Sequence, residues 1–303
     1  MSLRFSTQAQ VDIRRITGEL TDLQRQVASG VRANDLSGFG SASSRLLSAH
    51  GLKASTDARS SVLGQLDARL GVQGAALGEV SGASSRLAQA IRVAISANDG
   101  RGVGIELDLS FKSIVSALNE SWNGQPLFAG ERLDGIPVKV TTLDELAASS
   151  TPQDIFEEAE RRQSVDLGSG PPTEIAPKAS EVAGGLMQTL RDLKLLLDGA
   201  GGQIGQPIGD AQSLRLQEIA ATVEHHANTI VTEEGRTGQL QSRFASQRDR
   251  LRERSDLLVK EIGDHADADL AQVSMRLSAL MTQYEASAKT FADLSQLSLL
   301  RYL

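Results

Sequence analysis

The 303-residue chain contains no cysteine, few aromatic residues and no long apolar run. The absence of cysteine excludes disulfides, cysteine-based zinc sites and thiol chemistry. Aromatic residues make up 3% of the chain, whereas enzymes commonly fill thick cores and ligand pockets with them. This scarcity favours thin helix–helix seams of Leu, Ile, Val and Ala, and it argues against a deep pocket for a small-molecule substrate.

Positive charge is also limited, because 31 basic residues stand against 38 acidic ones and the net charge is −7. Proteins that bind nucleic acid or anionic membranes normally present a basic face. No stretch approaches the roughly 18 apolar residues of a membrane helix. Residues 1–10 lack the basic and apolar segments of a secretory signal. We therefore predict no nucleic-acid partner and no membrane association, and these features alone predict a soluble cytoplasmic protein.

Both ends of the chain carry apolar residues at alternating spacings of three and four, the pattern of a coiled-coil seam. An isolated amphipathic helix is marginal in water, so each seam needs a partner, and the simplest partner for the first helix is the last one. We predict that these two seams form an assembly interface. Its residues are Ile13, Ile16, Leu20, Leu23 and Val27 at one end, and Leu270, Val273, Leu277, Leu280, Tyr284, Phe291, Leu294 and Leu300 at the other.

The same spacing predicts long inner helices on both sides of the middle of the chain. One seam extends from Leu63 to Ala94, and the longest extends from Leu216 to Leu258. Shorter ones carry Leu107, Phe111, Ile114 and Leu118, and Leu186, Leu190, Leu193 and Leu197. Gly74, Gly78 and Gly82 lie four apart, which predicts close approach of another helix backbone. Gly263-Asp264 predicts a joint before the last helix.

The middle of the chain has a different composition, since residues 123–180 hold six of the seven prolines. Residues 136–142 are typical of a short strand, and residues 154–163 predict a short helix. The predicted fold is mainly α: a long antiparallel helical rod with terminal coiled-coil helices and a small β-containing inserted domain. The predicted segments are 1–40 (assembly helix and loop), 41–122 (first half of the rod), 123–180 (insert), 181–262 (second half of the rod) and 263–303 (assembly helix).

Motifs for catalysis or cofactor binding are scarce. His225 and His226 are adjacent, so on a helix their side chains point about 100° apart and do not easily share a metal. The glycine-rich stretches do not match a phosphate-binding loop, and no serine lies in a nucleophile elbow. The paired acids Glu157-Glu158 and Glu233-Glu234 are typical of solvated helix faces. We predict a protein that is not an enzyme, with no catalytic residue, metal site, cofactor or small-molecule substrate.

Segments at both ends of the chain resemble the bacterial flagellin family. Residues 27–34 are similar to the family's motif at the end of its first helix, through Ser29, Gly30, Arg32 and Asn34. Residues 269–271, 275–277, 284–287 and 297–300 are similar to its last helix. Residues 123–130 are similar to a stretch of the hook-associated members of the family, through Gly124, Leu127, Phe128 and Gly130, although Pro126 replaces their usual aromatic residue.

The resemblance implies a structural subunit that joins the flagellar hook to the filament. It implies export through the flagellar type III apparatus without a cleaved signal, and therefore an extracellular location on the flagellum. The implied partners are further copies of itself in a ring, a neighbouring hook-associated protein, filament flagellin and an export chaperone. Two alternatives stay open: a filament flagellin, and a cytoplasmic coiled-coil scaffold or signalling protein.

Overall fold

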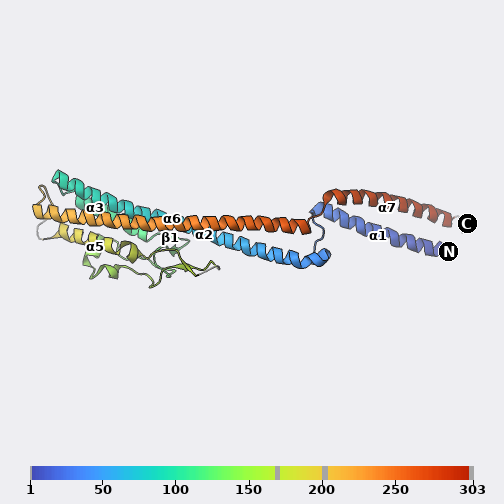
Figure 1. The fold of residues 1–303 in the computed structure, drawn as a ribbon, viewed down its shortest axis with the longest axis horizontal. Helices are drawn as coiled ribbons and strands as arrows, with labels where there is room; N and C mark the ends of the chain where they lie inside the picture. Colours follow the sequence, from blue (N-terminus) through green and yellow to red (C-terminus); the bar gives the residue numbers. More distant parts are fainter. Residues whose placement is uncertain (1, 168–170, 200–203, 300–303) are drawn as a thin grey trace. The chain divides into compact units, whose positions relative to one another are not determined.

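The computed structural model describes residues 2–167, 171–199 and 204–299, and most of them are helical (Figure 1). The chain divides into two compact units, one of Met1–Ala58 with Leu251–Leu303, the other of Arg59–Arg250. The predicted mainly α class with a small β-containing region is confirmed. The finer division into five segments remains a prediction. No described helix has a stretch both long and apolar enough to cross a membrane.

The first unit contains the helices of both chain ends. It comprises α1 (Ser2–Ser29), the 3-10 helix η1 (Leu36–Ala42), the start of α2 (Ser43–Ala97), the end of α6 (Asp210–Ala266) and α7 (Leu270–Leu299). Helix α1 runs beside α7 (Figure 1). Asp35 begins η1 by accepting a hydrogen bond from the Gly38 N–H at 2.9 Å. Asp269 begins α7 by accepting from the N–H groups of Ala271 and Gln272, both at 3.1 Å.

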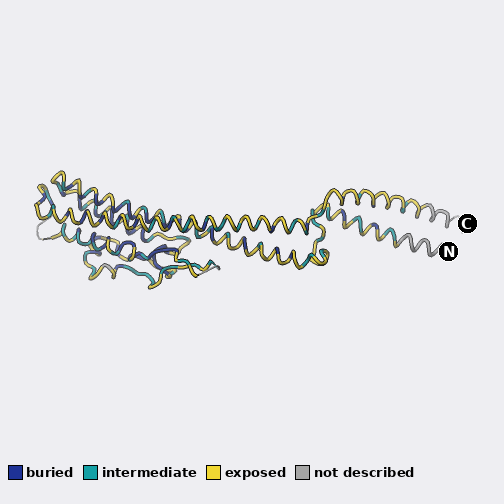
Figure 2. Tube along the Cα trace, in the orientation of Figure 1, coloured by how far each residue is buried: buried dark blue, intermediate teal, exposed yellow. Residues whose placement is uncertain are grey.

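The second unit is built on four helices that share one apolar core. These are the rest of α2 and α6 together with α3 (Val103–Leu118) and α5 (Ala179–Asp198). The inner helices predicted from the apolar spacing are present, and most of their seam positions are buried (Figure 2). Fully buried members of the core include Leu87 and Ile91 on α2, Leu107, Phe111 and Ile114 on α3, Leu186, Leu190 and Leu193 on α5, and Leu216 and Val223 on α6.

The inserted region is small and irregular. It holds two antiparallel hairpins, β1 (Ser121–Trp122) with β2 (Gln125–Pro126), and β3 (Ser164–Val165) with β4 (Thr173–Glu174). It also holds α4 (Leu143–Ala148), which Thr142 and Glu145 cap reciprocally, and the 3-10 helix η2 (Pro152–Ile155). The strand predicted at residues 136–142 is reduced to one bridge, between Val138 and Phe156.

The helix predicted at residues 154–163 is wrong. After η2 the chain is extended, because its backbone pairs with two other segments. The N–H groups of Glu157 and Ala159 donate to the carbonyls of Pro137 and Ala129, both at 2.9 Å. Glu157 also pairs with Arg132 at 2.6 Å and with Lys139 at 3.0 Å. These tertiary contacts outweigh the helix propensity of an acidic, alanine-containing segment.

Two predictions about glycines are also wrong. The joint expected at Gly263 lies later, because α6 continues to Ala266 before the break. The close helix approach expected along α2 is not present either. A Cβ added at Gly74 or Gly78 would meet only side-chain atoms of α6, at 3.9 Å from Thr237 Cγ2 and 3.6 Å from Glu234 Oε1. These are ordinary contact distances, so the packing does not require glycine.

Candidate assembly site

The two predicted terminal seams face each other. Ile16 and Leu23 of α1 are buried with Val273 and Leu280 of α7, and Leu20, Leu277 and Ala268 pack against them. The pairing predicted between the first and last helices is therefore present within one chain. The resulting core is narrow, because only those four described residues of the two helices are buried in it, and of them only Ile16 is fully buried.

Other predicted interface residues remain accessible. Val27, Leu270 and Tyr284 are exposed, at 41%, 48% and 38% of their surface, and Ile13 is half-buried. Phe291 and Leu294 lie on α7, but their side chains, together with all of Leu300, fall outside the described residues. The helix pair thus buries one stripe and leaves part of the predicted interface in contact with solvent.

The structure adds exposed apolar residues that the seam pattern missed. Val11 on α1 and Met275 and Met281 on α7 are exposed. At about 100° per residue, Met281 falls beside the buried stripe of α7, whereas Met275 falls on its opposite side. A search for apolar residues flanking the seam would have found Met281, but the three-four spacing alone does not include it. Most of the described residues of α7 are exposed (Figure 2).

The flagellin-like motif near residue 30 forms the joint between the terminal helices. Gly30 ends α1 with a positive φ of 75°, which glycine adopts without strain. Its carbonyl accepts from the Ala268 N–H at 2.8 Å, and the Arg32 N–H donates to the Ala266 carbonyl at 2.8 Å. The Arg32 guanidinium adds a bond to the Asp267 carbonyl at 3.0 Å. Ser29 bonds within its own helix and Asn34 is exposed. The motif therefore ties the end of α1 to the segment that precedes the start of α7.

The other family-like segment, residues 123–130, lies in the second unit. Leu127 and Phe128 are completely buried in the main core. The Phe128 carbonyl accepts from the Ala179 N–H at 2.8 Å, at the start of α5. Gly124 and Gly130 have positive φ angles of 77° and 66°. A Cβ at Gly130 would collide with the Arg161 carbonyl oxygen, so glycine is required there. This segment anchors the inserted region to the helical core.

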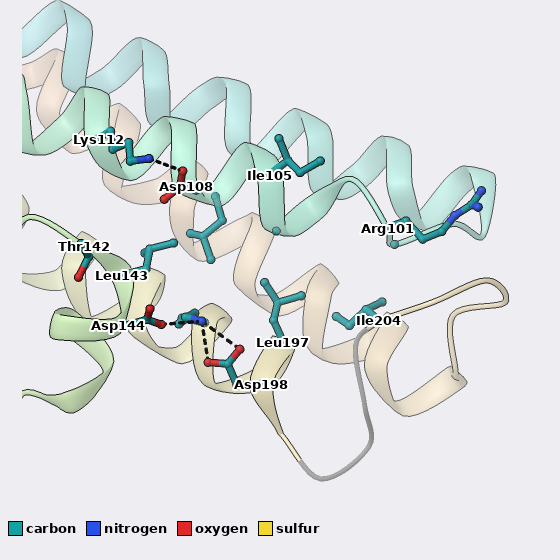
Figure 3. A pocket seen from close by; sticks show the side chains of 14 residues that line it. Arg101, Ile105, Asp108, Lys112, Thr142, Leu143, Asp144, Leu197, Asp198 and Ile204 are labelled. Atoms are coloured by element: carbon teal, nitrogen blue, oxygen red, sulfur yellow. Dashed lines mark hydrogen bonds and ion pairs between the residues drawn. The ribbon is translucent and has the colours of Figure 1, made fainter.

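A groove of about 510 Å³ lies among α3, α4 and α5 (Figure 3). Its acidic and basic side chains neutralise one another. Lys112 pairs with Asp108 at 2.7 Å, and Lys194 pairs with Asp198 at 2.8 Å and with Asp144 at 3.0 Å. Asp198 and then Asp144 raise the pKa of Lys194, which keeps this ammonium charged. The groove therefore offers charges that are already paired, lined also by apolar side chains such as Leu143 and Leu197.

The two histidines do not form a metal site. Their ring centroids lie 5.9 Å apart, and no group of three His, Asp or Glu residues gathers anywhere in the described part of the chain. The His226 ring instead packs against Gly185 of α5, leaving no space for a Cβ there. Burial, and then His225, lower the pKa of His226. Its position is that of a half-buried packing residue between α5 and α6.

Residues 220–303 match the family described as the bacterial flagellin C-terminal helical region. No curated protein matches the chain. The fold is similar to the solved structure of a flagellar hook-associated protein from Vibrio parahaemolyticus, with a TM-score of 0.61 and 16% identity over 76% of this chain and 100% of that one. The FlgL structure from Bacillus cereus aligns with a TM-score of 0.42 and 13% identity, over 83% of this chain and 99% of that one. The C-terminal region of this chain therefore matches the model of the flagellin C-terminal helical region, and the fold of the chain is similar to that of a flagellar hook-associated protein.

Proposed function

We propose that this protein is a structural subunit of the bacterial flagellum that joins the hook to the filament. The flagellin C-terminal region and the fold shared with a hook-associated protein support a flagellar role. The observation that carries the assembly role is the α1–α7 pair, whose apolar residues extend beyond the stripe that the two helices bury between them. The subunit acts mechanically and needs no cofactor.

The exposed residues give this proposal a physical basis. Leu270 and Met281 flank the buried stripe of α7, and Val27 lies at the end of the stripe of α1. Fully burying a side chain of this size contributes about 1.5–3 kcal/mol. A helix pair from a neighbouring copy would cover these residues, and repetition of the same contact around an axis gives a ring.

The remaining partners follow from the same role. A hook-associated protein and filament flagellin adjoin the ring on its two sides, and an export chaperone shields α7 before assembly. The chain reaches the outside of the cell through the flagellar type III apparatus, unfolded and without a cleaved signal. The residues that we assign to the interface are those predicted from the seams, with Met281 added.

The decisive experiment places a charge on α7 beside its buried stripe, at the exposed residue Met281. Met281→Asp is exposed in the single chain, so we expect normal export and an unchanged melting temperature, but loss of the protein from isolated hook–basal bodies in immunogold labelling. Thr282→Asp is the matched control, because Thr282 is the exposed neighbour on another side of α7 and should leave retention normal. Normal retention of Met281→Asp would refute the assembly role of this stripe.

The alternative of a filament flagellin is favoured by one observation, since the matched C-terminal region is a general flagellin region. Purified flagellin extends filament seeds into long polymers, and we expect this protein not to do so. A cytoplasmic scaffold would fail the secretion step of the same experiment, because it would stay in the cell pellet.

A further inference from the structure

The middle of α2 is rich in glycines that the packing does not require. Gly64, Gly71, Gly74 and Gly78 face α6, and a Cβ at each would lie 3.6–3.9 Å from side chains of Arg248, Gln241, Thr237 and Glu234. On α6, Gly235 and Gly238 have no atom within 4 Å of an added Cβ. Alanine fits at these sites, and each interior glycine makes the helical state about fivefold less favourable than alanine would.

The same section has buried polar residues among its buried apolar ones, which include Leu70 and Leu77. Gln73 is 1% exposed and Arg69 is 5% exposed. Gln73 Nε2 donates to Thr237 Oγ1 at 3.2 Å across the seam, but Gln73 Oε1 has no hydrogen-bond partner among the described residues. Arg69 donates to the Pro126 carbonyl at 3.3 Å, and its Nε is also unpaired there. Buried polar groups that are only partly satisfied weaken the closed arrangement.

The main apolar core begins within this section, at Ala76 and Leu77, and continues along the same helix. Ala83, Leu87, Ala88 and Ile91 are buried in the main core against α3. Residues 83–97 contain no glycine. Phe111 and Leu107 of α3 fill the space beside them. One continuous helix thus passes from a glycine-rich seam with partly satisfied polar groups into a seam without glycine.

We propose that residues 64–82 of α2, with residues 234–248 of α6, form a compliant section that opens locally in the native protein while residues 83–97 stay closed. Its glycines lower the cost of leaving the helical state, and its partly satisfied polar groups gain hydrogen bonds to water when the two helices separate or bend. This property belongs to the single chain and does not depend on the proposed flagellar role.

Hydrogen exchange followed by mass spectrometry on the full-length monomer tests the proposal. We expect amides of residues 64–82 to exchange roughly tenfold or more faster than those of residues 84–97 and 103–118. The triple variant Gly71→Ala, Gly74→Ala and Gly78→Ala should slow exchange in residues 64–82 on the order of 100-fold. Gly184→Ala, an open glycine of α5, is the control and should leave residues 64–82 unchanged.

A second variant tests the polar seam separately. Gln73→Leu with Thr237→Val replaces the buried polar pair by apolar side chains of similar size, and we expect slower exchange in the same section with a raised melting temperature. The proposal would be overturned if the amides of residues 64–82 in the unmodified protein exchanged as slowly as those of residues 84–97. Unchanged exchange in both variants would overturn it as well.

Discussion

The α1–α7 pair and the four-helix core of residues 59–250 differ in how completely they bury their apolar side chains. The four-helix core buries apolar side chains from α2, α3, α5 and α6 around completely enclosed residues such as Phe111 and Leu190. Among the described residues of the terminal pair, only Ile16, Leu23, Val273 and Leu280 are buried at its centre. The four-helix core therefore buries enough apolar surface to fold by itself, whereas the α1–α7 pair leaves apolar surface exposed for a partner.

The largest expected effect comes from placing a charge in the four-helix core. Leu190 is completely buried on α5, so Leu190→Asp creates an unpaired buried carboxylate and removes core packing. We expect a loss of at least about 4–5 kcal/mol in the free energy of unfolding, measured by circular dichroism during denaturant titration. Leu195→Asp on the same helix is the control, because Leu195 is exposed and should cost little. Equal losses in the two variants would mean that α5 is not part of a self-sufficient core.

The same change in the terminal pair should separate folding from assembly. Leu280 is buried between α1 and α7, and Leu280→Asp should open that pair while the unfolding transition of the four-helix core stays in place. We expect the variant to be secreted but not retained on the hook, so that filament subunits leak into the medium. Ala279→Asp, at an exposed neighbouring position, should be retained. Normal hook retention of Leu280→Asp would remove the assembly role of α7.

A smaller effect distinguishes the two glycines of the family-like segment. Gly130→Ala combines a positive φ with a collision against the Arg161 carbonyl, so we expect a loss of about 2–3 kcal/mol in the free energy of unfolding. Gly124 also has a positive φ but has open space around it, so Gly124→Ala should cost about 1 kcal/mol. Denaturant midpoints of the two variants provide the measurement. The opposite order would show that the contact at Gly130 is relieved by movement of the insert.

The helices of this protein could be predicted from the sequence because their burial repeats with the helical period. Ile16 and Leu280 lie at regular seam positions, and both are buried where the spacing placed them. The three-four spacing could not predict which residues beside the seam stay exposed, since this depends on how much of each helix its partner helix covers. Met281 was missed for this reason, and Val27 proved more exposed than its seam position suggested.

The insert was harder to predict because its structure depends on contacts between distant segments. Residues 154–163 have the composition of a helix, but Ala159 and Glu157 find backbone partners at Ala129 and Pro137. Those partners come from loops whose course no local pattern describes. Gln73 is a polar residue at a seam position of α2, and its unpaired oxygen could only be recognised from the structure.

The smallest expected effect concerns pH and lies within the four-helix core. Burial lowers the pKa of His226 below its ordinary value of 6.5, and His225 lowers it further. Well above pH 6.5 the imidazole is neutral in both the folded and unfolded chain, so it does not change stability. As the pH falls below 6.5, the unfolded chain binds a proton that the folded chain binds less readily, and stability decreases until the folded pKa is passed.

We therefore expect the wild-type protein to have a higher melting temperature at pH 7.5 than at pH 5.5, with part of this difference lost in His226→Gln. His225→Gln is the control, because His225 is exposed and should preserve most of the difference. Hydrogen bonds from Arg101 are the main cause that lowers the pKa of Asp99 to about 2. The range from pH 5.5 to pH 7.5 lies well above the pH at which this carboxylate takes up a proton. Asp99 therefore does not contribute to the slope. An identical pH dependence in wild type and His226→Gln would show that the ring between α5 and α6 is hydrated in solution and that its packing against Gly185 does not oppose protonation.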